Sequence, residues 1–334
     1  SGQKDFVKYS DPLEVAQQQY AELRDKSDIC VGLTHLDVAD DKKLAAMLPN
    51  IPLIMGGHDH ENMFYRVGNT VVAKADANAR TVYIHTLRYN KKKGTSTVKS
   101  ELRRIDEKIP DDPATAAVVA KWEKIKNNSL SSSGFDATKK VVVLKTPLDC
   151  REATVRKVQA PVGQMITAAM LAAGKHQPDR AILNGGSVRV DDILTGTLTE
   201  LDIVRMLPFG GGFSEVEMRG NILKKSLDAG LANQGNGGWL QWGQISRDEN
   251  INNWRINGAP LNVTKVYRVI LPDFLLTGLE SRMDFLKADP LNDGSNKTTN
   301  PDILALYRPG AADKDDVRSD IRLALIRYLR AGGE

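Results

Sequence analysis

Two histidines that stand two residues apart, His58 and His60, follow an apolar run and a pair of glycines. Residues 53–55 have the composition of a buried strand, and glycine allows backbone conformations that are closed to other residues. Neutral imidazole is the commonest protein ligand for transition metals. A second apolar run, residues 29–34, ends at His35. The pattern predicts a metal site built from His35, His58 and His60 at the ends of neighbouring strands.

Each histidine could instead be a loop or core residue that makes one hydrogen bond. For His35 alone this is the simpler interpretation, whereas the preceding glycine pair favours metal binding by His58 and His60. Imidazoles and carboxylates at strand ends suit Zn²⁺, Mn²⁺ or Fe better than Ca²⁺, which prefers oxygen ligands. Three histidines supply only part of a two-metal centre, and no Asp-x-His or Gly-Asn-His grouping precedes residue 29. We therefore expect the metal site of this chain to be incomplete.

A second group of polar and aromatic residues lies in the carboxyl-terminal half. Asn184 and Arg189 flank a glycine turn, where backbone can approach a ligand and the guanidinium can grip a phosphate or carboxylate. Phe209 stands between a proline and three glycines, which suits a ring that stacks on a nucleobase. The structural alternatives are that Arg189 pairs with Asp191 or Asp192 and that Phe209 fills the core.

The composition is that of an ordinary globular protein. The 334 residues are enough for two domains, and 41% of them are hydrophobic. A net charge of +4 lacks the dense basic face that nucleic-acid binding requires, and no apolar run approaches the ~20 residues that span a bilayer. Two cysteines, Cys30 and Cys150, imply no disulfide framework, and we expect no signal peptide at the first residues.

The hydrophobic pattern predicts alternating strands and helices. Asp11 is the expected N-cap of a helix over residues 11–28, and the strand–helix–strand order over residues 29–55 predicts a parallel βαβ unit. The other expected elements are strands at 70–74, 81–90, 95–105, 140–144 and 180–183, helices at 40–48, 114–127, 161–173 and 317–329, and a loop at 129–134.

Five motifs occur in the order found in 5'-nucleotidases, and the chain resembles that family over nearly its whole length. The motifs are His35, Gly56-Gly-His-Asp-His60, Asn184-Gly-Gly-Ser-Val-Arg189, Leu207-Pro-Phe-Gly-Gly211 and Leu271-Pro-Asp-Phe-Leu-Leu-Thr-Gly278. The resemblance implies an α/β (α+β) fold in which a partial calcineurin-like metallophosphoesterase β-sandwich with flanking helices precedes a complete nucleotide-binding domain. Residues 1–105 resemble the carboxyl-terminal half of the metallophosphoesterase domain, residues 106–135 a connector helix and hinge, and residues 136–334 the 5'-nucleotidase C-terminal domain.

The same resemblance implies roles for individual residues. His35, His58 and His60 match metal ligands of a centre that holds two divalent ions, Zn²⁺ or Mn²⁺, in the family. The positions that match the substrate-binding part of the family are Arg156 and Arg189 for phosphate, Asn184 and Gly186 around the base, Phe209 and Phe274 as the two rings that clamp the base, and Gly278 and Glu280 at the ribose.

Some residues depart from the family pattern. Ser187 and Val188 replace Gly-Ile, and Leu279 and Glu280 replace Gly-Asp, so we expect a shifted substrate preference. The largest departure is that the first half of the catalytic domain, with its remaining metal ligands, does not occur in the sequence. The implied parent is a metal-dependent hydrolase of nucleoside monophosphates, and we expect this chain alone to bind nucleotides but to hydrolyse them poorly.

The alternative function is a binding module for a nucleotide, a nucleoside or a protein partner, with a vestigial metal site. An associated amino-terminal fragment is a further expected partner, whereas nucleic acid and insertion into a membrane are not expected. The family works outside the cytoplasm, so the resemblance implies an extracellular or periplasmic location.

Overall fold

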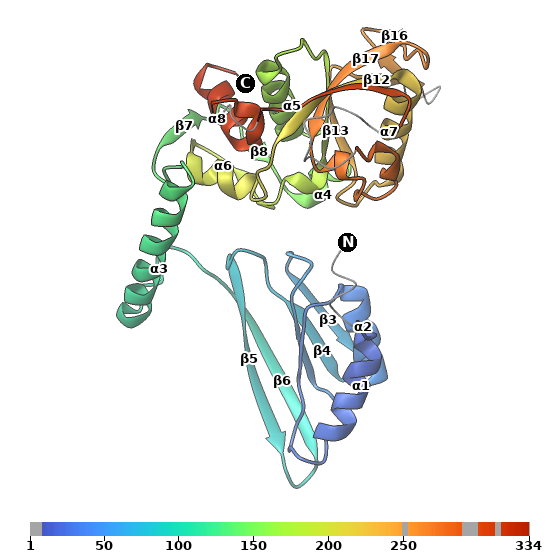
Figure 1. Cartoon of the computed structure of the whole chain (residues 1–334). Coiled ribbons are helices and arrows are strands. Elements are labelled where there is room, and N and C mark those ends of the chain that lie inside the picture. The colour runs from blue at the N-terminus through green and yellow to red at the C-terminus, as the bar shows by residue number, and fades with distance from the viewer. Residues whose placement is uncertain (1–8, 249–252, 289–299, 311–314, 334) are drawn as a thin grey trace. The chain divides into compact units, whose positions relative to one another are not determined.

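The computed structural model of the chain describes residues 9–248, 253–288, 300–310 and 315–333. It divides into two compact units (Figure 1), an amino-terminal unit of residues 1–119 and a carboxyl-terminal unit of residues 120–334. Helix α3 (Pro113–Ser132) contains the division between them. None of the described helices is both long and apolar enough to span a membrane.

The amino-terminal unit is built around a four-stranded sheet in the order β1-β2-β4-β3. Strands β1, β2 and β4 run parallel and β3 is antiparallel to β4. The elements of this unit are α1 (Pro12–Leu23), β1 (Gly32–Thr34), α2 (Val38–Met47), β2 (Leu53–Gly56), β3 (Met63–Val67), β4 (Thr70–Lys74), β5 (Thr81–Asn90) and β6 (Thr95–Arg104).

Alternate residues of β2 and β4 fill two separate cores, because successive side chains of a strand point to opposite faces. Ile54 and Val72 pack against α1 and α2 on one face of the sheet. Leu53 and Val71 pack on the other face against side chains of the β5–β6 hairpin, Tyr83 among them. Both faces of the sheet are therefore covered.

The carboxyl-terminal unit contains a five-stranded sheet in the order β13-β9-β17-β12-β18. Its β9 and β17 are parallel and the other neighbours are antiparallel. The strands are β7 (Lys140–Val143), β8 (Leu148–Asp149), β9 (Arg180–Asn184), β10 (Ile193–Leu194), β11 (Thr197–Thr199), β12 (Phe213–Arg219), β13 (Leu240–Gly243), β14 (Ser246–Asp248), β15 (Asn253–Ile256), β16 (Ala259–Pro260), β17 (Val266–Pro272) and β18 (Ile303–Tyr307).

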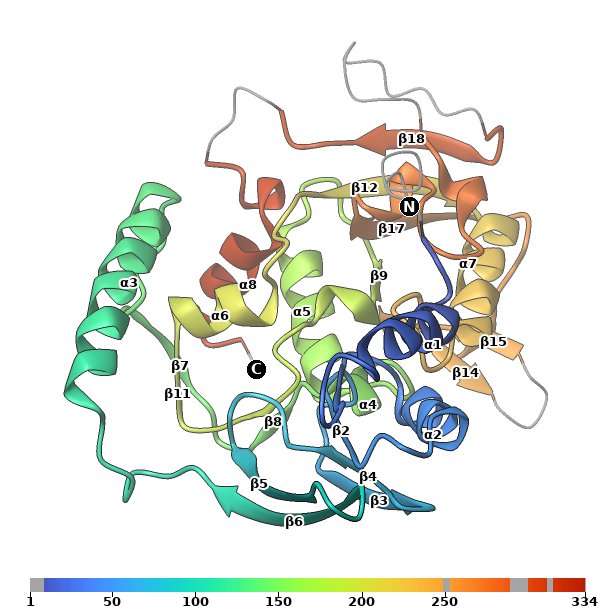
Figure 2. The same cartoon turned by 90° about the horizontal axis from the view of Figure 1, so that it is seen from below.

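Helices cover both faces of this sheet. Figure 2 shows α5 and α8 on one side of β9 and β17, and α7 on the other. The helices are α4 (Glu152–Val155), α5 (Pro161–Ala173), α6 (Glu200–Met206), α7 (Gly220–Ala232) and α8 (Ile321–Arg330), with short 3₁₀ turns η1 (Gly185–Ser187), η2 (Leu275–Thr277), η3 (Asp284–Leu286) and η4 (Val317–Ser319).

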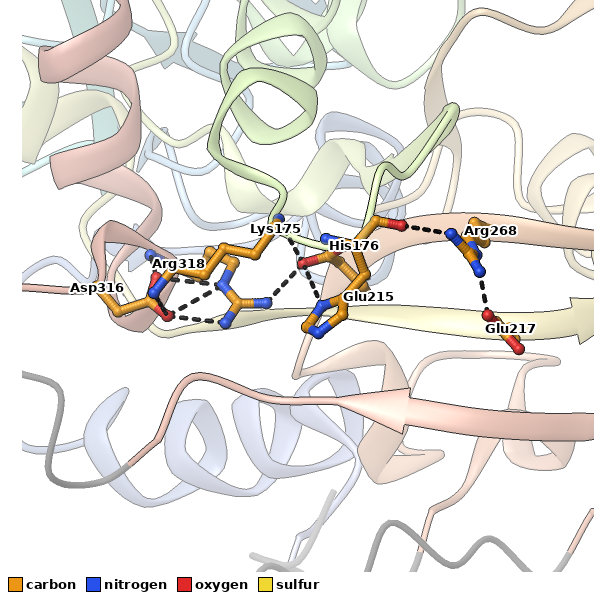
Figure 3. Close-up of polar contacts among 7 residues, drawn as sticks. All are labelled: Lys175, His176, Glu215, Glu217, Arg268, Asp316 and Arg318. Atoms are coloured by element: carbon orange, nitrogen blue, oxygen red, sulfur yellow. Dashed lines mark hydrogen bonds and ion pairs between the residues drawn. The ribbon is translucent and has the colours of Figure 1, made fainter.

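A buried charge cluster ties three of these segments together (Figure 3). The Arg318 guanidinium donates to Glu215 Oε1 at 2.6 Å and to Asp316 Oδ2 at 2.8 Å, and all three residues are almost fully buried. Lys175, just after α5, adds an ion pair to Asp316 at 2.9 Å. Glu215 lies on β12 and Arg318 in η4, so the cluster fixes the first residues of β12 and the start of α8.

The mixed α/β fold class predicted from the sequence is confirmed, as is the parallel pairing of β1 with β2. The Asp11 carboxylate caps α1 by accepting from the amides of Leu13 and Glu14, although the helix ends at Leu23 and not at residue 28. The predicted bounds of β4, β5 and α5 agree with the structure.

Two predictions of local structure were wrong, and one strand was missed. The predicted loop at 129–134 begins as helix, since α3 continues to Ser132 and the Ser132 hydroxyl donates to the Asn128 carbonyl. Residues 317–319 form a 3₁₀ turn, and α8 begins after them because Asp320 caps its amino end. Strand β3 was not predicted at all.

Candidate functional site

The predicted metal-binding histidines gather where β1 and β2 end, an arrangement we call the histidine edge (His35, His58 and His60). His35 follows β1 and the other two follow β2, and parallel pairing brings these strand ends together. The rings of His35 and His58 meet edge to face with centroids 5.3 Å apart. His58 Nε2 lies 3.1 Å from Asp37 Oδ1.

The backbone of the histidine edge is held in an unusual conformation. His58 has φ 81° and His60 has φ 61°, both in the left-handed region that few non-glycine residues adopt. A Cβ at Gly57 would lie 3.1 Å from the Nδ1 of His35, so glycine allows the two loops to approach without displacing this ring. Strain of this kind is typical of sites where surrounding structure fixes a functional geometry.

Lys74, which the sequence did not single out, lies at the centre of this region. The side chain is only 1% exposed, and Nζ contacts Asp41 Oδ2 at 2.7 Å and the Asp59 carboxylate. Nζ also donates to the carbonyls of Leu36 at 2.5 Å and Gly57 at 2.8 Å. These carbonyls belong to the residues next to His35 and His58, so one ammonium group joins the two histidine loops.

Burial works against the charged form of Lys74, but its hydrogen bonds with Asp41 and Asp59 outweigh burial and raise the pKa of the amine. The only hint of this role in the sequence is a lysine that ends an otherwise apolar strand.

The donors at the histidine edge do not form a complete metal-ligand set. Nowhere in the described part of the chain do three His, Cys, Asp or Glu side chains converge on one possible ion position. His35 and His58 are neighbours, and Asp37 is within reach of His58. A catalytic ion would need donors beyond those that this arrangement brings together.

The carboxyl-terminal unit contains a cavity of about 440 Å³ at the carboxyl end of β9 and next to the loop before β12. Five of the eight residues predicted to bind substrate line it, and Arg156, Arg189 and Gly278 lie outside its wall. The lining residues are Asn184, Gly186, Ser187, Leu207, Phe209, Gly210, Gly211, Gly212, Pro272, Asp273, Phe274, Glu280 and Ile321.

Two phenylalanines on this wall are exposed instead of packed in the core. Phe209 is 73% exposed and Phe274 is 45% exposed, which excludes the alternative that Phe209 fills the core. Phe209 precedes Gly210 and Gly211, whose φ values are 56° and 83°. These left-handed positions turn the chain sharply after α6, and the turn leaves the ring on the surface.

The polar part of the cavity is organised by Asn184, which ends β9. Its amide nitrogen donates to Glu280 Oε2 at 3.2 Å, and its Oδ1 accepts from the Ser187 hydroxyl at 2.8 Å. Gly186 lies so close to Gly237 that a Cβ would be 3.0 Å from the Gly237 Cα. Three predicted residues, Asn184, Gly186 and Glu280, therefore share one wall.

Gly278 shapes the segment that carries Glu280. It ends η2 with φ 71°, and a Cβ there would come within 2.9 Å of the Lys287 Cβ. Asp273 is a cavity residue that the sequence analysis missed. Burial raises the pKa of its carboxyl group, and a hydrogen bond from Ser214 opposes this rise.

The two predicted phosphate-binding arginines meet beside the cavity. Arg156 Nη2 and Arg189 Nη1 both contact Glu152 Oε1, the second at 3.3 Å. The Arg189 guanidinium lies over the ring of Phe209, 5.8 Å from its centroid. Among the described residues Arg189 therefore pairs with Glu152, and not with Asp191 or Asp192 as the structural alternative proposed.

The segment around Arg156 is fixed by a buried amide. Gln241 Nε2 donates to the carbonyls of Val155 at 2.8 Å and Val158 at 2.6 Å, on either side of the arginine. Exposed rings, a polar wall and two guanidinium groups together suit a flat, partly apolar ligand with an anionic end.

Comparisons with known proteins show which proteins this chain is similar to. The family described as "5'-nucleotidase, C-terminal domain" matches residues 140–288. The 5'-nucleotidase of Bos taurus is 26% identical over 299 residues, which cover 74% of this chain and 50% of the relative. That of Vibrio cholerae is 25% identical over 327 residues, which cover 81% of this chain and 57% of the relative. The chain thus spans about half the length of these curated relatives.

A solved structure has the same fold. The 5'-nucleotidase precursor from Thermus thermophilus aligns over 96% of this chain and 65% of its own length, with a TM-score of 0.69 and 21% identity. Residues 140–288 are thus similar to the 5'-nucleotidase C-terminal domain, most of the chain is similar in sequence to curated 5'-nucleotidases, and the fold is shared with a solved one.

Proposed function

We propose that this chain binds a nucleoside or nucleotide in the cavity of its carboxyl-terminal unit. The base stacks between Phe209 and Phe274, and the phosphate end points to Arg156 and Arg189. Glu280 and the turn at Gly278 lie near the ribose. The observation that carries this proposal is that two exposed rings both line the cavity, with a guanidinium group over one of them.

The corresponding reaction is hydrolysis of a nucleoside monophosphate or a related phosphate ester, with Zn²⁺ or Mn²⁺ as the metal of the family. His35, His58 and His60 are the candidate ligands of this chain, but within its described residues too few donors converge there to hold a catalytic ion. We therefore propose that this chain alone hydrolyses nucleotides poorly, and that a companion segment supplies the other ligands. An enzyme-like rate of AMP hydrolysis by the purified 334-residue protein would contradict this.

The remaining parts of the proposal follow from the family. Residues 1–105 are proposed to be the metallophosphoesterase part, residues 106–135 a connector that acts as a hinge, and residues 136–334 the nucleotide-binding domain. We propose an extracellular or periplasmic location.

A non-catalytic nucleotide-binding module is the second candidate function. It is favoured by the same incomplete donor set among the described residues of the histidine edge. Metal content separates the two candidates. If the protein binds Zn²⁺ or Mn²⁺ and the His58→Ala variant does not, the enzyme is supported. If the protein contains no metal and the His58→Ala variant has the same properties as the unaltered protein, the module is supported.

Calorimetric titration with adenosine, AMP and inorganic phosphate tests the nucleotide site. Stacking contributes about 1–3 kcal/mol per base, so Phe209→Ala and Phe274→Ala should each weaken adenosine binding roughly fivefold to 150-fold. Trp122→Ala is the matched control, because this ring is also exposed but lies on α3 and lines no part of the cavity. Adenosine affinity that survives both phenylalanine changes would refute the aromatic clamp.

A further inference from the structure

Glu152 occupies the position where two guanidinium groups converge beside the cavity. Arg156 and Arg189 both contact one of its carboxylate oxygens, Oε1. Guanidinium groups bind phosphate through the same kind of charge-assisted hydrogen bond that they form with a carboxylate. The side chains of Glu152 and Arg189 are 29% and 42% exposed, so this ion pair is open to exchange with a ligand.

The backbone of this segment is fixed independently of that ion pair. The Glu152 amide, at the start of α4, donates to Asp191 Oδ1 at 2.8 Å. The carbonyl of Arg156 accepts from the Gly235 amide at 2.7 Å, and the amide of Arg189 donates to the Met206 carbonyl at 2.9 Å. The backbone at both arginines is therefore held without help from the carboxylate of Glu152.

Glu152 does not use all of the donors that the arginines offer. The Arg156 Nε–H is buried and has no hydrogen-bond acceptor within the described residues. A guanidinium has five N–H donors and binds planar or tetrahedral anions through two of them at once. An incoming phosphate would meet the guanidinium of Arg189, which is 42% exposed, but it would also meet the negative charge of Glu152.

We propose that Glu152 is a specificity-determining residue that competes with the phosphate of the ligand for Arg156 and Arg189. This inference rests on the proposed nucleotide site. The three charged groups sum to +1 with Glu152 and to +2 without it, so the carboxylate weakens the attraction for a phosphate dianion. The carboxylate repels an uncharged or singly charged ligand less than it repels a dianion. Compared with a site that has the two arginines but no Glu152, this site therefore has a stronger preference for nucleosides and singly charged nucleotide esters.

Titration of Glu152→Gln with adenosine, AMP and inorganic phosphate tests this role. Glutamine keeps the shape of the side chain and removes the charge. AMP and phosphate should bind about two- to fivefold more tightly, the size expected when one partly exposed charge is removed. Adenosine affinity should stay within about twofold of the original, because the change does not touch the base.

Glu123→Gln is the matched control, since it removes an exposed, lysine-paired carboxylate on α3 and changes the net charge of the protein equally. It should leave all three affinities unchanged. If adenosine binds but Glu152→Gln leaves the ratio of AMP to adenosine affinity unaltered, or lowers it, Glu152 is not a competitor and only this inference fails. If adenosine does not bind the unaltered protein at all, the nucleotide site itself fails and this inference falls with it.

Discussion

The histidine edge of the amino-terminal unit and the cavity of the carboxyl-terminal unit both depend on ion pairs, but at different depths. At the histidine edge Lys74 is 1% exposed and contacts two carboxylates and two backbone carbonyls. Beside the cavity Arg189 is 42% exposed and shares one oxygen of Glu152 with Arg156. The first ion pair fixes backbone, and the second leaves charged groups within reach of a ligand.

Depth decides what each ion pair can do. Breaking a buried pair strands a charge in a medium of low polarity and is costly, whereas exposed pairs contribute little to stability and exchange easily. Lys74 is therefore a structural residue of the histidine edge. Glu152 is proposed to give up its arginine partners to a ligand. Substitutions in each region distinguish the structural role of Lys74 from the ligand-binding role of the cavity.

Lys74→Met should have the largest effect. It leaves the carboxylates of Asp41 and Asp59 without their cation, and breaking such a buried pair costs about 3–5 kcal/mol. Hydrogen exchange measured by mass spectrometry should show faster exchange in β1, β2 and β4. All four tryptophans lie beyond residue 119, so a urea transition followed by tryptophan fluorescence should not move.

Lys43→Met is the matched control for Lys74, because Lys43 pairs with Asp40 in an exposed position. It should leave hydrogen exchange unchanged. Equal effects of the two variants would show that depth does not distinguish these ion pairs.

Gly186→Ala should have the next largest effect, and in the other unit. The added Cβ would lie 3.0 Å from the Cα and 3.2 Å from the carbonyl oxygen of Gly237, and overpacking of this kind costs about 1–3 kcal/mol. The urea midpoint followed by tryptophan fluorescence should fall, and adenosine should bind more weakly. Gly310→Ala, where a Cβ meets no described atom within 4 Å, is the control. An unchanged midpoint for Gly186→Ala would show that this wall of the cavity can adjust.

A pH effect of intermediate size is expected at Asp149, which precedes the segment that carries Glu152. Hydrogen bonding to Arg151 lowers the pKa of Asp149 to about 2, from an ordinary value of 3.8. A lowered folded-state pKa adds stability above the unfolded value, and this stability is lost as the pH falls from about 4 to 2.

Asp149→Asn should therefore destabilise the carboxyl-terminal unit by about 1–2 kcal/mol at about pH 6, after allowance for partial exposure, and by much less at about pH 2.5. Urea transitions at the two pH values measure the difference. A destabilisation that does not depend on pH would assign the effect to shape and not to charge.

His58→Ala should have the smallest effect on ligand binding. His58 belongs to the histidine edge, whereas the proposed base site lies wholly in the carboxyl-terminal unit. Adenosine affinity measured without metal should stay within about twofold. A large loss would show that the two regions act as one site even for a ligand that has no phosphate.

The sequence predicted the elements with clean patterns and missed those without them. The bounds of β4 and α5 were predicted because apolar runs end abruptly at polar or glycine residues. Strand β3 was missed because its three central residues, Phe64, Tyr65 and Arg66, are all exposed and give no alternation. Helix α3 continued through serines that normally favour loops because the Ser132 and Ser133 hydroxyls bond to carbonyls one turn back.

The candidate site was predictable where local sequence determines the geometry. Phe209 between proline and glycines was expected to be exposed, and it is. The roles of Lys74 and Glu152 could not be predicted, because they depend on partners far away in the sequence. Lys74 pairs with Asp41, 33 residues earlier, and Glu152 with Arg189, 37 residues later. Only the folded chain brings such charges together.

The central claim is that Phe209 and Phe274 hold a nucleobase between them. A crystal structure of the protein with adenosine tests it directly. The account predicts the purine ring in the cavity, with one face against each phenyl ring and its edge toward Asn184. Adenosine bound elsewhere, or two phenyl rings packed against each other with no base between them, would contradict it.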